Sequence, residues 1–247
     1  MKVALVPLDL QPGKPYENLD NIEKAVTQTI SFKPDLICFP EMVDVGEGPP
    51  PYGQFLSLAE PIPGKYTHKL TTLAKNHNIY LVTGLLEASE YGFYSSAVLI
   101  NPSGQILLKH RQVHNAPPYQ IGSGFQVVNT TLGRISIAIC GDVFESDIAQ
   151  QLLEGKVDHL FVPMDFCGDN EELGKLSTQS PPAYLKEWEA RFAEITLQTG
   201  ATLWAVNAIT PDTSTECGAC GGAFVYQAGK SVFRGNVCTK DIYVIKK

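Results

Sequence analysis

The chain has 247 residues, of which 44% are hydrophobic and 18% are charged, and its 26 acidic and 19 basic side chains give a formal net charge of −7. This composition is typical of a globular protein with a sizeable core, and it excludes a disordered or collagen-like chain. No run of Lys or Arg is long enough to follow a phosphate backbone, so nucleic acid is not an expected partner.

The length also favours one large domain, since a typical domain has roughly 150 residues and α/β folds often exceed that number; we place it over residues 1–247. The start, MKVALVPLDL, is too short an apolar run for a secretory signal, and no stretch approaches the roughly 18 to 20 apolar residues that cross a bilayer. A cytoplasmic protein without a membrane partner is therefore expected. Six cysteines are few for this length, and Cys38 and Cys140 lie in apolar runs, so no disulfide framework is predicted.

Hydrophobic periodicity predicts strands that alternate with helices along most of the chain. Residues 2–6 and 35–39 are apolar runs, and residues 18–30 between them carry apolar side chains at helical spacing, which predicts a βαβ unit with parallel strands. Further helices are expected at residues 65–77, 148–153 and 182–199. Further strands are expected at residues 79–82, 95–100, 106–108, 126–128, 134–139, 159–162, 202–206, 222–226, 232–233 and 242–245. This order predicts an α/β fold, a layered sandwich with mixed sheets.

Polar side chains follow three of these apolar runs, at the strand ends where α/β proteins usually place their sites. Glu41 follows LICFP, Cys140 follows ISIAI, and the segment KHRQVH follows ILL. A cysteine attacks as the thiolate, and a partly buried Glu can take its proton, so the pair favours a cysteine enzyme. A cysteine at a strand end is also a common core residue, and a Glu after Pro is a common turn residue. Spacing alone leaves both interpretations open.

Several ordered blocks resemble the nitrilase, or carbon-nitrogen hydrolase, superfamily over nearly the whole chain. DLICFPEM resembles the strand that ends in the family's catalytic Glu, which falls on Glu41, and GRISIAICGD resembles the nucleophile strand, which puts the nucleophile on Cys140. YSSAVLINPSGQILLKHRQVH resembles the central hairpin with the family's Lys motif. The remaining blocks that resemble the family are AEPIPGKYTHKLTTLAKNHNIYLVTG, WEARFAEITLQTGATLWAVN and GGAFVYQAGK.

The resemblance implies a four-layer αββα sandwich that pairs with a second copy, as a homodimer or higher homo-oligomer. It implies cleavage of a non-peptide C–N bond in a small-molecule substrate through a thioester or thioimidate on Cys140, with Glu41 as general base. Neither a metal nor an organic cofactor is implied. We assign substrate-binding roles to His114, Asp142 and Asp165.

One position departs from the family pattern, because Gln112 stands where the family has its oxyanion-stabilising Lys. Gln112 remains our third candidate catalytic residue, although an amide brings no positive charge, and losing an oxyanion donor costs roughly 2.7 to 4 kcal/mol. Lys109 lies an odd number of positions earlier, so in an extended segment its side chain faces the opposite side. His110 and His114 share the side of Gln112 and are better candidates for a substitute cation.

The residues around Cys140 and after Gln112 match the family pattern only in part. The acidic residue two positions after the nucleophile is present as Asp142, but the sequence Glu-Ser-Asp at 145–147 replaces the usual Phe-Pro-Glu, and residues 115–123 contain no acid to serve as the family's second Glu. Cys217 and Cys220 form a CxxC motif, for which a zinc or redox pair is an alternative to the Gly-rich turn that we favour. The pocket walls are expected from residues 43–52, 115–124 and 167–183.

Two hypotheses follow from the sequence. In the first, the chain is an amidase-type hydrolase in which Cys140 is the nucleophile, Glu41 the general base, and Gln112 part of a weakened oxyanion site. In the second, the chain has the nitrilase fold but binds a small ligand or a partner without turnover, because the catalytic Lys is lost.

Overall fold

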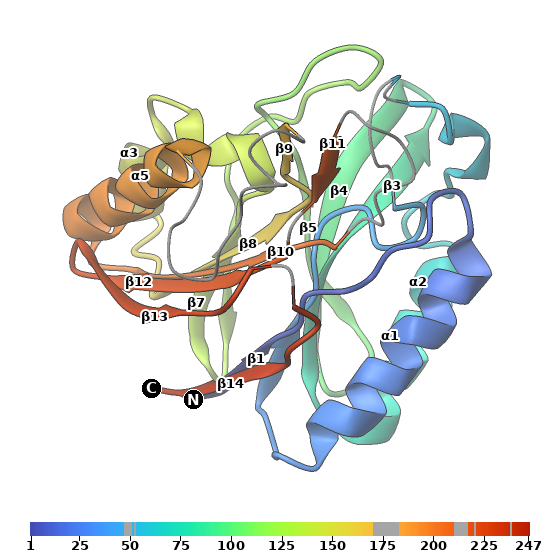
Figure 1. The fold of residues 1–247 in the computed structure, drawn as a ribbon, viewed down its shortest axis with the longest axis horizontal. Coiled ribbons are helices and arrows are strands. Elements are labelled where there is room, and N and C mark those ends of the chain that lie inside the picture. Colours follow the sequence, from blue (N-terminus) through green and yellow to red (C-terminus); the bar gives the residue numbers. More distant parts are fainter. Residues whose placement is uncertain (47–50, 52, 170–182, 210–216, 220, 238) are drawn as a thin grey trace.

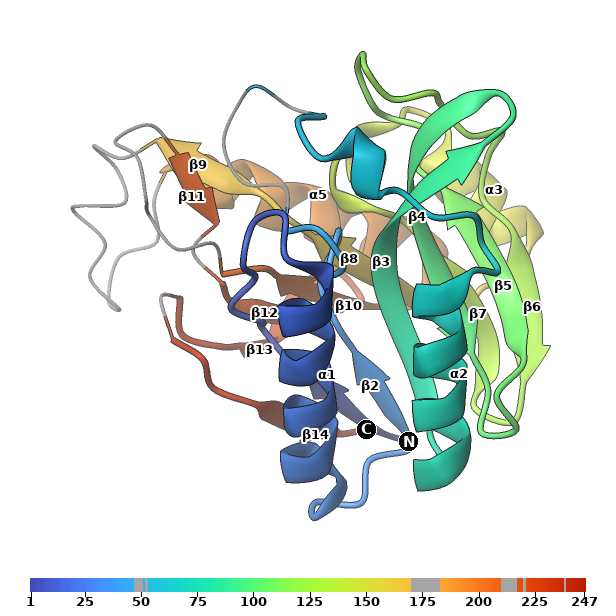
Figure 2. The same ribbon diagram turned by 90° about the vertical axis from the view of Figure 1, so that its right-hand side faces the viewer.

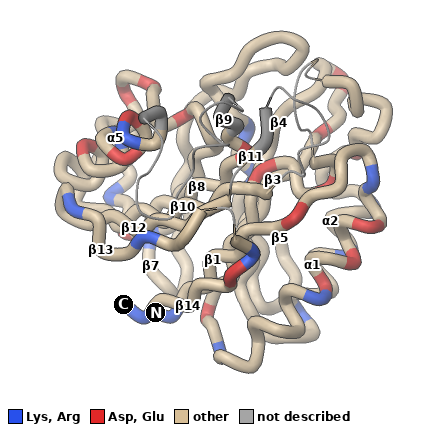
Figure 3. Tube along the Cα trace, in the orientation of Figure 1, with Lys and Arg blue, Asp and Glu red and all other residues tan. Residues whose placement is uncertain are grey.

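The computed structural model describes residues 1–46, 51, 53–169, 183–209, 217–219, 221–237 and 239–247 (Figure 1). Two six-stranded sheets face each other, and helices cover the outer face of each (Figures 1 and 2). Basic positions are scattered among acidic ones and form no continuous stripe along the described chain (Figure 3). None of the helices in this part of the chain is long and apolar enough to cross a membrane.

The first sheet has the strand order β14-β1-β2-β3-β4-β5. Its parallel part, β1 to β3, comes from the predicted βαβ unit and its successor, whereas β4, β5 and β14 pair antiparallel to their neighbours. Its strands are β1 (Lys2–Leu5), β2 (Leu36–Cys38), β3 (Tyr80–Ser89), β4 (Gly92–Ile100), β5 (Ile106–Arg111) and β14 (Tyr243–Lys246). Helices α1 (Pro15–Ile30) and α2 (Lys65–His77) cover its outer face (Figure 2).

The second sheet has the order β13-β12-β10-β8-β7-β6, and β7, β8 and β10 are parallel. Its strands are β6 (Val127–Thr130), β7 (Gly133–Ile137), β8 (His159–Met164), β10 (Thr202–Asn207), β12 (Ala223–Gln227) and β13 (Lys230–Arg234). Helices α3 (Ile148–Glu154) and α5 (Ala183–Thr199) cover it. Two short strands, β9 (Cys167–Asp169) and β11 (Cys217–Ala219), pair with each other, and two 3₁₀ turns are η1 (Leu56–Leu58) and η2 (Cys140–Phe144).

Three apolar layers separate these four layers of structure. In β1, Val3 and Leu5 face the layer between the two sheets, whereas Ala4 faces the layer under α1 and α2, as the two-residue period of a strand requires. On the other side, Phe224 of β12 packs against Phe192 of α5, with ring centroids 6.1 Å apart. The predicted αββα sandwich is therefore confirmed.

The predicted elements are found, with differences mainly in length. Helix α2 has the predicted bounds, while β3, β4 and β5 are longer than predicted, because strand pairing continues beyond the predicted runs, through residues 83–89, 92–94 and 109–111. The short pair of β9 and β11 and the two 3₁₀ turns are absent from the sequence prediction. They lack the length over which hydrophobic periodicity can be read.

Candidate active site

The predicted catalytic residues lie at strand ends contributed by both sheets. Glu41 follows β2, and Gln112 follows β5, in the first sheet; Cys140 follows β7, and Asp165 follows β8, in the second. The hydrogen bonds described below show that these four chain segments meet at one end of the interface between the sheets. The structure therefore brings together residues that are far apart in the sequence.

Glu41 is buried, and its carboxylate is held from two sides. The Ser95 hydroxyl donates to Oε1 over 2.6 Å, and the Asp165 N–H donates to Oε2 over 3.2 Å. Strand β3 passes so close to Glu41 that only glycine fits at position 84, because a Cβ atom there would lie 2.5 Å from the Glu41 Cα atom. Ser95 has no signal in the sequence, since its position opposite Glu41 depends on sheet pairing.

Cys140 stands on a sharp turn at the start of η2, with φ at +42°, in the left-handed region that residues other than Gly rarely adopt. Its thiol lies near the Glu41 carboxylate and Asp165, close enough for both residues to act on its pKa. Burial, followed by the negative charges of Glu41 and Asp165, raises the pKa of the Cys140 thiol well above its ordinary value. The thiol of Cys140 therefore keeps its proton at neutral pH.

The side-chain amide of Gln112 connects Ile139, which precedes Cys140 in the nucleophile segment (residues 139–142), to Asn115. Its Nε2 donates to the Ile139 carbonyl oxygen over 3.1 Å, and its Oε1 accepts from Asn115 Nδ2 over 2.7 Å. The side chain is buried. The residue in the lysine position thus links the end of β5 to the residue before Cys140.

Asp142 is fully buried, and its carboxylate accepts four hydrogen bonds from groups in the described chain. They come from the N–H groups of Ile139, Val113 and His114, over 2.7, 2.8 and 2.9 Å, and from His110 Nε2, over 2.7 Å. A carboxylate offers about four acceptor positions, so these donors saturate it. This placement departs from the predicted substrate contact, because the oxygens are committed to the protein's own donors.

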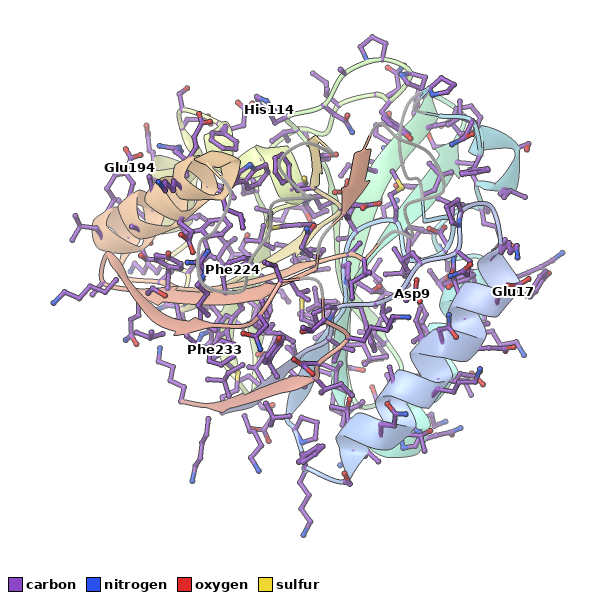
Figure 4. All side chains as sticks on the ribbon, viewed as in Figure 1. Asp9, Glu17, His114, Glu194, Phe224 and Phe233 are labelled. Atoms are coloured by element: carbon purple, nitrogen blue, oxygen red, sulfur yellow. The ribbon has the colours of Figure 1, made fainter. Side chains whose placement is uncertain are left out.

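His114 lies on the surface of the protein, next to Gly141. Its side chain is 52% exposed and lies toward the exterior (Figure 4), and its Nδ1 is 2.8 Å from Glu145 Oε1. The His114 ring also covers Gly141, where a Cβ atom would lie 2.9 Å from the ring. His114 is thus at the rim of the site, paired with one of the acids that replace the family's usual Phe-Pro-Glu run.

Lys109 and Arg111 face away from the nucleophile, as the odd spacing predicts for Lys109. Both bind the buried carboxylate of Glu87 on β3, over 2.6 Å from Lys109 and 2.8 and 2.9 Å from Arg111. Burial alone would raise the pKa of Glu87, but the hydrogen bonds from Arg111 and Lys109 outweigh it and hold that pKa below its ordinary value. Together with Tyr94 and His110, the two cations line a cavity of about 420 Å³.

Sequence reasoning missed Glu87, because only the register of β3, β4 and β5 places it beside two cations from another strand. Parts of the predicted pocket walls, at 47–50, 52 and 170–182, lie outside the described residues, as does Cys220. Within the described ranges, no group of His, Cys, Asp or Glu is arranged to hold a metal ion. The CxxC motif begins in β11, whose backbone pairs with β9.

Comparison with known proteins adds to this geometry. The family model described as carbon-nitrogen hydrolase matches residues 2–172. The curated omega-amidase NIT2 of Xenopus tropicalis is 27% identical over 165 residues, which are 60% of this chain and 58% of that protein. The match thus spans somewhat more than half of that relative's length.

Solved structures share the fold over nearly the whole chain. A carbon-nitrogen hydrolase from Helicobacter pylori G27 is similar with a TM-score of 0.84 and 17% identity, over 99% of this chain and 88% of the other. An amidase from Nesterenkonia sp. AN1, seen as a mutant with acrylamide added to its active-site cysteine, is similar with a TM-score of 0.77 and 19% identity, over 100% and 93%. At these identities the likeness concerns the fold.

Proposed function

Because this chain belongs to the carbon-nitrogen hydrolase family, we propose that it is a cysteine-dependent hydrolase that cleaves the C–N bond of a small amide or related non-peptide compound. The observation that carries the proposal is the nearness of the Cys140 thiol to the buried Glu41 carboxylate, which is held in place by Ser95 and by the Asp165 N–H and acts on the pKa of the thiol. A carboxylate in this position can remove the thiol proton during attack. The acrylamide adduct on the active-site cysteine of the Nesterenkonia amidase supports the same role for Cys140.

In the proposed reaction, Glu41 takes the thiol proton as the Cys140 sulfur attacks the carbonyl carbon, and the carbonyl electron pair moves to oxygen. When the carbonyl re-forms, the C–N bond breaks, and the leaving nitrogen takes the proton from Glu41, which leaves a thioester. Water then attacks the thioester carbon as Glu41 removes one of its protons. Collapse of this second intermediate releases the carboxylic acid and returns the proton to the sulfur.

The oxyanion in this scheme would rest on backbone N–H groups at Cys140 and on the amide of Gln112. One Gln112 N–H group already donates to Ile139, so the amide has at most one left for the oxyanion. We assign substrate contacts to Asp165 and to His114 at the rim, and a supporting role to the saturated Asp142. An oxyanion site without a charged donor supports a slow rather than an efficient hydrolase.

A second candidate function is a nitrilase-fold protein that binds a small ligand or a partner without turnover. The observation that favours it is the combination of an uncharged residue in the lysine position and two acids, Glu41 and Asp165, that both disfavour the Cys140 thiolate. Activated cysteines usually lie in electropositive surroundings.

We further propose that the protein forms a homodimer or a higher homo-oligomer and acts in the cytoplasm. Exposed apolar side chains on the packed pair α5 and β13, Leu197 at 70% and Val232 at 56%, support an assembly surface there. Neither proposal bears on the chemistry of the site.

The test of the hydrolase is the reactivity of its nucleophile together with turnover. Iodoacetamide is expected to label Cys140 faster than the other cysteines despite its raised pKa, because Glu41 removes the proton during the attack. The change Glu41→Gln is expected to slow that labelling at least tenfold, because the loss of the base outweighs the loss of a charge that raises the thiol pKa. Peptide mass spectrometry measures both rates. Equal labelling of all six cysteines, with no hydrolysis on a broad panel of amides and nitriles, would favour the binding function instead.

A further inference from the structure

Ile139, the residue that precedes Cys140, is held at both of its backbone polar atoms. The Ile139 N–H donates to Asp142 Oδ2 over 2.7 Å. Its carbonyl oxygen accepts from the Asp142 N–H over 2.9 Å and from Gln112 Nε2 over 3.1 Å. Because Cys140 itself stands in a left-handed backbone conformation, this double anchoring fixes the direction of its side chain.

Asp142 joins the two sheets beside the nucleophile. Its Oδ1 accepts from the N–H groups of Val113 and His114, which follow the edge strand of the first sheet, while its Oδ2 accepts from Ile139, which follows a strand of the second. A buried carboxylate needs all of these partners, since an unmet charge in a dry interior is costly. The position of Ile139 therefore depends on how well Asp142 is satisfied.

His110 supplies the fourth hydrogen bond to this carboxylate. The ring is 2% exposed and stacks on Phe125, with centroids 5.3 Å apart and planes 18° from parallel. Its Nε2 lies 2.7 Å from Asp142 Oδ2, and because the carboxylate accepts, Nε2 is the donor. Its Nδ1 is buried and has no partner within the described chain. Within the described chain, the hydrogen bond from Nε2 to Asp142 is therefore the polar contact that the ring makes.

We propose that His110 is a positioning residue for Cys140, acting through Asp142 and Ile139 without touching the substrate. The inference rests on the proposed function for the role of Cys140 as nucleophile. Displacing a reacting atom by about 1 Å can cost on the order of 100-fold in rate. A less firmly held Asp142 would therefore displace the Cys140 sulfur and slow its reactions.

Two substitutions of His110 distinguish the effect of its Nε2 hydrogen bond to Asp142 from the effect of losing the imidazole ring. In His110→Asn the amide sits near the position of Nδ1 and does not reach Asp142, whereas in His110→Gln the amide nitrogen reaches the position of Nε2. We expect His110→Asn to slow alkylation of Cys140 by iodoacetamide roughly 10-fold or more, and His110→Gln to restore most of the rate. The control His68→Gln, exposed on α2, should leave it unchanged.

All rates are measured well below the thermal midpoint, so that loss of folded protein does not contribute. A lowered midpoint with an unchanged alkylation rate in His110→Asn would show a merely structural role and overturn the proposal. Alkylation needs no turnover. A wild-type protein that hydrolyses no amide would therefore count against the proposed function, while the comparison of Asn and Gln decides the positioning role separately.

A second measurement on the unaltered protein covers the case in which His110→Asn fails to fold. Hydrogen exchange of the backbone amides of Val113, His114 and Ile139 should be as slow as exchange within β7, because all three donate to Asp142. Exchange at the rate of exposed loops would contradict the anchoring on which the proposal depends.

Discussion

Cys140 lies in surroundings that stabilise the thiol and not the thiolate. Burial and two nearby carboxylates act in the same direction on its pKa, and the residue in the lysine position contributes hydrogen bonds in place of charge. The sulfur can therefore react only if its proton leaves during the attack. Glu41 becomes the residue on which any chemistry at Cys140 depends.

The change Gln112→Lys tests this electrostatic account. A buried ammonium near Cys140 would favour the thiolate, so labelling by iodoacetamide at pH 7 is expected to rise about tenfold or more. Thermal stability should fall, because Asn115 loses the acceptor that Gln112 Oε1 provides. The uncharged control Gln112→Met should lose similar stability without faster labelling. Equal labelling rates in the Lys and Met variants would contradict the account.

Asp44 gives a pH dependence of stability that is independent of catalysis. Burial raises the pKa of its carboxyl from 3.8 to about 7, against the opposing hydrogen bonds from Leu86 and Val45. Between these pH values the folded state binds the proton and the unfolded state does not, so stability is lost as pH rises from about 4 to about 7. Asp44→Asn should flatten this part of the profile, as measured by urea unfolding at several pH values.

The exposed acid Asp20 on α1 provides the control, since Asp20→Asn leaves the burial of Asp44 unchanged. If the Asp44→Asn and wild-type proteins differed in unfolding free energy by the same amount at pH 4 and at pH 8, the carboxyl would not titrate in the folded state as described.

At the level of elements, β5 shows how one strand serves two polar networks. His110 and Gln112 face the nucleophile segment, and Lys109 and Arg111 face Glu87 on the other side. The two-residue period of a strand is readable from the sequence, so the separation of these side chains was predictable. The partners were not, because strand register, which brings Glu87 and Ser95 into place, leaves no local signal.

Gly84 on β3 allows this strand to pass close to the backbone of Glu41. In Gly84→Ala the added Cβ would meet the Glu41 Cα at 2.5 Å and the Met42 nitrogen at 3.0 Å, and neither backbone atom can move freely. We expect a loss of roughly 1–3 kcal/mol in unfolding free energy. Labelling of Cys140 should also slow, since Glu41 is displaced.

Gly200→Ala separates crowding from backbone strain. Gly200 has φ at +73° but nothing within 4 Å of its added Cβ. Its substitution should cost stability through strain alone and leave Cys140 labelling unchanged. Slower labelling in this variant as well would mean that the effect at Gly84 is not local to Glu41.

At the scale of the whole molecule, the sequence contained the order of strands and helices and, through resemblance, the four layers and the positions of Glu41 and Cys140. It did not contain the division of the strands between two sheets. β14 returns from the end of the described chain to pair with β1, a contact that local periodicity cannot reveal. The cross-sheet role of Asp142 was hidden for the same reason.

The nucleophile and its base are carried by different sheets, Cys140 after β7 and Glu41 after β2. During refolding, each sheet could acquire its strands while the sulfur and the carboxylate were still apart. The reactive pair comes into existence only when the apolar faces of the two sheets dock. Competence at Cys140 is thus a property of the completed sandwich, and we expect it to return no earlier than this docking when the chain refolds.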